Sequence, residues 1–345
     1  MALFLFALSL MRAGASYLTP ILAEAGKLPS PWHSLGVGWL MACLALSGSP
    51  VAAAAVSLQD AQVLSPAAAL TMLTGSRVGA SFVLFVIGLS YALRRGHPGN
   101  SLSTGFLAFW VTVTTYLPAT ALGLLMLRYV PVRWIARAQL PFLPALLEPV
   151  RGLVRVVEQI LRRGVSELFG KAAPESVIGV LLFLVGFFLI GLALQALERS
   201  VPVPQLARVE ADPPKGSPWP MFGAGLAVTA LTMSVSVSIG VLVPAVAQGW
   251  IRRERLIPYV MGANISTFID TLFAALILGN PQGMGVVLTE ILSVGLVSAL
   301  LLLFGYRVYQ ALLLRVLELA MERPPLLVLF LIAFLGLPLI LLGWG

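Results

Sequence analysis

The sequence predicts an all-α integral membrane protein built from two homologous halves, and three observations support this prediction. The 345 residues are 59% hydrophobic and only 10% charged, whereas a soluble domain carries roughly 25% charged residues. The apolar runs approach the length of about 20 residues that a helix needs to cross a bilayer, and such runs suit helices rather than a barrel. A set of residues also occurs twice at a constant spacing.

The internal repeat is a gapless match with an offset of 187 residues, from Ser30 to Ser217 and from Gly75 to Gly262. The matched residues of the first copy are Ser30-Pro31-Trp32, Gly36, Gly38, Leu44, Ser47, Ser49, Val56 and Gly75, and those of the second copy are Ser217-Pro218-Trp219, Gly223, Gly225, Leu231, Ser234, Ser236, Val243 and Gly262. A set of this length indicates an internal duplication. We expect the two copies to be inverted relative to each other, with their broken segments meeting near the bilayer midplane.

Nine apolar stretches are expected to form the membrane part. They are 3–22, 36–58, 65–93, 105–127, 176–197, 222–248, 256–278, 283–304 and 326–342. The first is expected to be a retained span rather than a signal peptide, because it lacks a basic leading region and a clear cleavage site. The second and sixth are interrupted at Ser47-Gly48-Ser49-Pro50 and at the corresponding serines of the second copy. A further interruption is expected at Gly75–Gly79, where glycines weaken a helix.

The interrupted stretches have two interpretations. One is a kinked helix whose serines bond to their own backbone. The other is a re-entrant hairpin whose tip presents hydroxyl and free N–H groups, because a break at membrane depth is tolerated where it is buried or lines a cavity. The occurrence of the break in both copies favours the hairpin.

The chain divides into four segments. Residues 1–130 form the first transmembrane half, 131–174 an amphipathic interfacial connector, 175–305 the second half, and 306–345 an amphipathic helix followed by a final span. Amphipathic helices of this kind lie on the membrane surface.

The protein is expected in the cell membrane, which is the inner membrane if the source is bacterial, and the basic residues of 128–171 favour a cytoplasmic location for that segment. The net charge is +8, and its basic residues lie in connecting segments such as Arg94-Arg95 and Arg252–Arg255. This distribution fits cytoplasmic loops beside anionic lipid and not nucleic-acid binding. A cytoplasmic location of both named turns would conflict with a simple inversion of the repeats.

The two serine tracts and the tracts that follow them resemble the sodium-dependent phosphate cotransporters of type II. In that family, each of two inverted halves carries a Gln-Ser-Ser-Ser tract and a Gly-Ala-Asn-Ile-Gly-Thr-Thr tract. Here Met233-Ser234-Val235-Ser236 and Gly262-Ala263-Asn264-Ile265-Ser266-Thr267 match the second pair. Leu46-Ser47-Gly48-Ser49 and the tract from Gly75 to Ser81 match the first. The resemblance covers 30–90 and 217–277. It implies a symporter that works by alternating access, and it is compatible with a homodimer.

The resemblance assigns two sets of residues. The substrate-binding set is Ser47, Gly48, Ser49, Arg77, Ser234, Val235 and Ser236, and the ion-binding set is Ser238, Asn264, Ser266, Thr267 and Asp270. Serine hydroxyls and N–H groups at helix N-termini suit an anion. Unwound carbonyls, serines and an asparagine could supply the oxygen ligands of a sodium ion, the one cofactor-like ion expected.

Several positions depart from the family pattern. Leu46 and Met233 replace the two glutamines, and Arg77 replaces the first asparagine. Asp270 corresponds to Val83, where an acid is not usual. Because a buried arginine and a buried aspartate are costly unless paired, we expect Arg77 and Asp270 to face each other. The alternative is that each has its own local partner. If paired, the guanidinium could replace a sodium ion or bind the anion directly.

Four other polar residues lie outside these two sets. Glu290 is expected at the membrane interface rather than in a proton relay, since it lies early in its span. Arg12 either snorkels towards the lipid headgroups or has a protein partner at depth. His33 and His97 lie in predicted turns without clustered partners, which makes a metal site improbable.

The leading functional prediction is a sodium-coupled secondary transporter of a small oxyanion, with inorganic phosphate first. The alternatives are coupling to protons, a lipid-linked phosphate as substrate, and a non-transporting scaffold that has kept the fold. An intramembrane enzyme is not expected, because no Ser-His pairing, metal-ligand cluster or acid pair at catalytic spacing is present.

Overall fold

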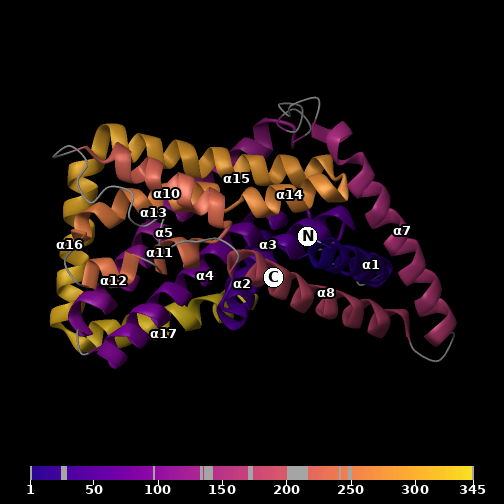
Figure 1. Ribbon diagram of the computed structural model, residues 1–345, viewed down its shortest axis with the longest axis horizontal. Helices are drawn as coiled ribbons and strands as arrows, with labels where there is room; N and C mark the ends of the chain where they lie inside the picture. The colour runs from indigo at the N-terminus through magenta and orange to yellow at the C-terminus, as the bar shows by residue number, and fades with distance from the viewer. Residues whose placement is uncertain are drawn as a thin grey trace.

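The computed structural model describes residues 2–24, 29–95, 98–132, 135, 143–169, 174–199, 217–240, 242–247 and 251–343. All regular structure in these ranges is helical, which confirms the predicted all-α class. The helices are α1 (Ala2–Glu24), α2 (Pro31–Ala45), α3 (Ser49–Asp60), α4 (Pro66–Arg95), α5 (Pro98–Tyr129), α7 (Leu143–Phe169), α8 (Glu175–Arg199), α10 (Trp219–Thr232), α11 (Val235–Gly240), α12 (Leu242–Ala247), α13 (Arg253–Ser266), α14 (Ile269–Leu278), α15 (Pro281–Leu300), the π-helical turn η1 (Leu301–Gly305), α16 (Tyr306–Glu322) and α17 (Pro324–Leu342). Most run along the long axis, whereas α7 flanks one end and α16 crosses the other (Figure 1).

Six segments of the described chain are long and apolar enough to cross a membrane, which agrees with an integral membrane protein. They are Pro66–Gly88, Leu102–Tyr129, Glu175–Ala196, Arg253–Leu278, Pro281–Glu322 and Pro325–Leu342. The buried share is 78% in Arg253–Leu278 and 17% in Pro325–Leu342. Helices α13 and α14 are therefore central, and α17 is peripheral.

Two glycines let α2 pack against α4 with backbone touching backbone. A Cβ added to Gly38 would lie under 3.0 Å from the carbonyl oxygen of Met72, and a Cβ on Gly75 would lie equally close to the carbonyl oxygen of Leu35. Real Cβ atoms do not approach so closely, so only glycine fits at these two positions.

Helices α10 and α13 pack against each other in the same way. A Cβ on Gly225 would meet the carbonyl oxygen of Tyr259, and a Cβ on Gly262 would meet that of Phe222, again under 3.0 Å. Each of these four residues stands 187 positions after its counterpart in the α2–α4 pair. The sequence match therefore coincides with two helix pairs that share one packing contact.

The predicted helix breaks are present, and each begins with a residue in the left-handed conformation. Leu46 follows α2 with φ 49°, and Met233 follows α10 with φ 53°. A serine comes next, and helices α3 and α11 begin at Ser49 and Val235. These two left-handed residues are the positions at which the resembled family has glutamine. Leu46 is half exposed and does not point into the polar interior.

Substitution of Leu46 by glycine tests this left-handed conformation. Glycine adopts positive φ without steric cost, and Leu46 buries little surface. We expect Leu46→Gly to leave the melting temperature in detergent unchanged or to raise it slightly. Leu44→Gly is the matched control, because Leu44 is also exposed but lies inside α2. It should cost about 1 kcal/mol, since glycine is a poor helix former. Equal losses in both variants would contradict the assigned backbone.

One predicted break is wrong. Helix α4 runs without interruption through Gly75–Gly79, because α2 covers the glycines and holds them in helical backbone. The corresponding part of the second copy is broken further along, at Thr267 and Phe268 between α13 and α14.

The amphipathic segments form helices that are attached to the rest of the protein. Helix α7 covers 143–169 of the predicted connector and packs on α1 and α14. Its Arg151 donates from Nε to the carbonyl oxygen of Leu276 at 2.9 Å, which satisfies a carbonyl at the end of α14. Helix α16 continues from α15 through η1, a π-helical turn of the kind that redirects helices. His33 lies in the first turn of α2 rather than in a loop, and His97 is outside the described residues.

Candidate functional site

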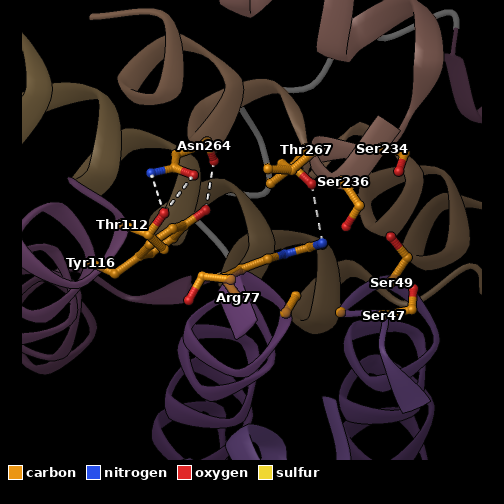
Figure 2. Close-up of a pocket in the computed structure, with 13 residues that line it drawn as sticks. Ser47, Ser49, Arg77, Thr112, Tyr116, Ser234, Ser236, Asn264 and Thr267 are labelled. Atoms are coloured by element: carbon orange, nitrogen blue, oxygen red, sulfur yellow. Dashed lines mark hydrogen bonds between the residues drawn. The ribbon is translucent and has the colours of Figure 1, made fainter. Parts of the chain in front are cut away.

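A polar cavity lies where the two helix breaks face each other (Figure 2). The cavity is small, with a volume of about 20 Å³, which is room for about one water molecule. Its lining residues are Ser47, Gly48, Ser49, Arg77, Ala80, Ser81, Thr112, Tyr116, Ser234, Val235, Ser236, Asn264 and Thr267. The lining thus comes from the breaks α2–α3 and α10–α11 and from helices α4, α5 and α13. All seven residues of the predicted substrate-binding set are among it.

The two breaks bring hydroxyl groups and helix starts to this cavity. On one side α3 begins at Ser49, with Gly48 as its N-cap residue and Pro50 in its first turn. The positive end of the α3 dipole therefore lies at the cavity. On the other side the Ser234 hydroxyl accepts a hydrogen bond from the N–H of Val237, which caps α11. Ser236 remains partly exposed between the two breaks.

Arg77 is the cation of the cavity and is almost fully buried, with 5% of its side chain exposed. Its Nη1 donates to the Thr267 hydroxyl at 3.1 Å, and its Nη2 donates to the Thr271 hydroxyl at 3.0 Å. Nη2 also lies 3.5 Å from a carboxylate oxygen of Asp270. The guanidinium stacks over the ring of Phe268, with its carbon 4.6 Å from the ring centre. The predicted contact between Arg77 and Asp270 is confirmed.

Gly48 lies beside Arg77 and against the backbone of α4. A Cβ on Gly48 would lie 3.4 Å from Nη1 of Arg77 and closer still to the carbonyl oxygen of Ser76. The resembled family has serine at this position. The backbone of α4 at Ser76 therefore requires glycine at position 48, whereas the Arg77 side chain alone would not.

The ion pair leaves polar groups unsatisfied. Nε of Arg77 and the second carboxylate oxygen of Asp270 are buried and have no hydrogen-bond partner within the described part of the chain. The other carboxylate oxygen accepts from the hydroxyl of Thr271 at 2.9 Å. A pair with spare hydrogen-bonding capacity can bind a ligand without first breaking all of its existing contacts.

The predicted ion-binding set is divided by the fold. Asn264 and Thr267 line the cavity. Ser238 instead bonds with Thr229 and Tyr259 between α10, α11 and α13. Ser266 lies 3.5 Å from two carbonyl oxygens of its own helix, and Asp270 is engaged by Arg77. These oxygens do not converge on one point, and no group of three His, Cys, Asp or Glu residues suited to a metal occurs within the described ranges.

Thr112 and Tyr116 belong to the site but were not predicted. They stand four residues apart on α5, so they lie on one face of it. The Tyr116 hydroxyl donates to the carbonyl oxygen of Asn264 at 2.7 Å, and the Asn264 side chain lies within 3.5 Å of the Thr112 hydroxyl. These hydrogen bonds connect α5 with α13. The missed signal was a tyrosine one helical turn after an intramembrane threonine.

Glu290 is the clearest correction. It was expected at the membrane interface, yet it is completely buried in α15. Its Oε1 accepts from the Thr74 hydroxyl at 2.8 Å, and its Oε2 has no partner among the described atoms. The position early in α15 was misleading because α4 and α5 both cover this part of the helix.

Arg12 has protein partners and does not only snorkel. Its Nε lies 2.9 Å from a carboxylate oxygen of Asp60 and 3.9 Å from one of Glu158. The contacts connect α1 with α3 and α7. Of the two interpretations of Arg12, the paired one is correct.

The fold and cavity define a multi-pass helical membrane protein with a buried polar site between broken helices, in which Arg77 is paired with Asp270. Comparison of the chain with protein-family models, with curated proteins and with solved structures found no match. The similarity to the type II phosphate cotransporters thus rests on the quoted motifs.

Proposed function

We propose that the protein is a secondary transporter that moves a small oxyanion, with inorganic phosphate as the first substrate to test. The observation that carries this proposal is the cavity that combines Arg77, four serines of two helix breaks and the start of α3. Arginine suits phosphate because its planar fork makes two parallel hydrogen bonds. Broken helices that meet inside a membrane protein are the usual construction of transporter binding sites.

A pattern that recurs in the two parts of the chain supports the transporter interpretation. The left-handed residues, the serines after them and the glycine contacts all occur at the 187-residue offset. We propose that the two halves are inverted repeats whose breaks form re-entrant tips on either side of the substrate. Rocking of one half against the other would then open the cavity to alternate sides.

Uptake of phosphate into proteoliposomes tests the proposed function. Wild type should accumulate phosphate, and Ser234→Ala/Ser236→Ala should lose most of the uptake, because both hydroxyls line the cavity. Ser9→Ala/Ser298→Ala is the matched control, since both serines are fully buried outside the cavity. It should transport normally.

An imposed sodium gradient separates the coupling alternatives. Sodium-dependent uptake would support the coupling that the resemblance implies. Uptake indifferent to sodium would retain the transporter and transfer the coupling to another ion. No uptake by wild type under any gradient would contradict phosphate as the substrate.

A lipid-linked phosphate is the second candidate substrate, and an apolar groove favours it. The groove lies between the end of α2 and the face of α8, where Leu184, Phe187, Phe188 and Leu192 line it. Ser47 and Ser236 line both the groove and the polar cavity. An alkyl chain in the groove would place its phosphate beside the two serines. Competition of phosphate uptake by a long-chain alkyl phosphate, but not by the matching alcohol, would support this candidate.

A further inference from the structure

The described chain buries one carboxyl group that neither the Arg77–Asp270 pair nor the cavity uses. Glu290 is fully buried in the middle of a bundle of apolar helices. A carboxylate taken out of water is very costly unless several donors or a cation compensate it. Within the part of the chain that the structure describes, the only hydrogen-bond donor to Glu290 is the Thr74 hydroxyl, and Oε2 receives no hydrogen bond.

The contacts of Thr74 accommodate both protonation states of Glu290. Besides Glu290, the Thr74 hydroxyl lies 3.3 Å from the carbonyl oxygen of Leu70 and 2.9 Å from the Thr120 hydroxyl. When Glu290 is charged, Thr74 donates to it. When Glu290 carries a proton on Oε1, it donates to Thr74, which turns its own hydrogen towards Leu70. Rotation of one hydroxyl therefore switches between the two states without moving a helix.

Glu290 is connected to the anion cavity by short steps along two helices. Thr74 lies three residues before Arg77 on α4, and both face the packed interior. On α5 the Thr120 hydroxyl donates to the carbonyl oxygen of Tyr116, which lines the cavity. Thr74 and Thr120 therefore link Glu290 to the two helices that carry Arg77 and Tyr116.

The surroundings of Glu290 contain few other charges. On the elements that pack against α15, the described charged groups besides the three above lie at helix ends. They are Asp60 at the end of α3, which is paired with Arg12, Arg128 in the last turn of α5, and Arg253, Glu254 and Arg255 in the first turn of α13. Arg77 and Asp270 neutralise each other, so the net charge near the cavity is set by Glu290.

We propose that Glu290 is a proton-binding site whose occupancy is coupled to an anion on Arg77, so that the protein moves an oxyanion together with a proton. The proposal rests on the proposed function. An anion beside Arg77 adds negative charge to a region that already contains Asp270. A proton on Glu290 offsets that charge, so each ligand strengthens the binding of the other by the same factor. No covalent step is involved, since Glu290 gains and loses one proton in each cycle.

The protonation of Glu290 is tested by infrared difference spectroscopy on the full-length protein. A pH step should produce a carbonyl band of a protonated carboxylic acid that is present in wild type and absent in Glu290→Gln. Glu175→Gln is the matched control, because Glu175 is exposed at the start of α8, and it should keep the band. A band that persists in Glu290→Gln, or that never appears in wild type, would overturn the proton site.

The coupling is tested by phosphate binding and by proton movement in sodium-free proteoliposomes. Glutamine imitates the protonated carboxyl in shape and charge. Glu290→Gln should therefore bind phosphate at least as tightly as wild type at alkaline pH. The part of the pH dependence of phosphate affinity that comes from protonation of Glu290 should be absent in this variant. Phosphate-driven acidification of the lumen, corrected for the protons that phosphate itself carries, should fall to background in Glu290→Gln and stay normal in Glu175→Gln.

The outcomes distinguish the two proposals. Identical pH dependence of phosphate affinity in wild type and Glu290→Gln would overturn the coupling. A wild type that shows the infrared band but neither binds nor transports phosphate would contradict the proposed substrate and the coupling to it, while the proton site itself would stand. Strict sodium dependence with no proton movement would overturn symport with protons.

Discussion

Arg77→Asp is expected to abolish the folded protein or its transport, and Arg77→Asp/Asp270→Arg is expected to restore part of both. The single variant places two carboxylates together where 3% of the Asp270 side chain is exposed. Removal of one partner of a buried pair typically costs about 3–5 kcal/mol, and a like charge adds repulsion. The double variant restores opposite charges, although the arginine then begins from α14 and loses its place beside Gly48.

The measurement for this pair is the fraction of monodisperse protein and its melting temperature in detergent, followed by phosphate uptake. Arg307→Asp is a suitable control, because Arg307 is an exposed residue of α16. It should behave like wild type. If the double variant has the same melting temperature and uptake as Arg77→Asp, the contact between the two side chains does not stabilise the protein. Arg77 would then be required for its other contacts.

Gly225→Ala and Gly262→Ala are expected to cause the second large effect, a loss of stability of about 1–3 kcal/mol or more. At both positions the new methyl group would meet a backbone carbonyl oxygen under 3.0 Å away. Backbone of a neighbouring helix cannot rotate aside as a side chain can, so α10 and α13 would have to separate. Since Asn264 and Thr267 lie on or directly after α13, the cavity would change as well.

Gly223→Ala provides an internal control in the same helix. A Cβ on Gly223 has no atom within 4 Å. Because alanine is the better helix former by about 1 kcal/mol, this variant should be as stable as wild type or more so. Gly38→Ala and Gly75→Ala should repeat the loss between α2 and α4. Equal melting temperatures for Gly223→Ala and Gly225→Ala would refute the backbone contact.

The position of the cavity lining could be predicted from sequence because its residues are breaks in otherwise apolar runs. Pro50 and the serines around Gly48 and Val235 disrupt helices, and a disruption at that depth requires a buried polar site. Arg77 and Asp270 could be matched because two opposite charges in related apolar tracts have few alternative partners.

The remaining site residues could not be predicted, since they depend on how helices pack. Tyr116 becomes a cavity residue only because α5 lies against α13, and its spacing from Thr112 indicates a shared face of α5 but not what that face contacts. Glu290 was placed at the interface from its distance to the start of α15, although α4 and α5 cover it. Gly75–Gly79 did not break α4, because glycine in a span is as often a packing contact as a break.

Helix α4 is continuous, whereas the corresponding sequence of the second copy forms two helices, and this difference has a consequence for any movement of the protein. Helix α4 is a continuous helix of 30 residues, whereas the matching segment of the second copy is interrupted at Thr267 and Phe268 between α13 and α14. Arg77 extends from α4 and contacts both helices. It bonds Thr267 at the end of α13, and it contacts Asp270 and Thr271 at the start of α14. Bending there costs less than bending α4, and it requires the guanidinium to release at least one side. An anion bound to the guanidinium would replace one of these contacts, so the ligand itself would permit bending between α13 and α14.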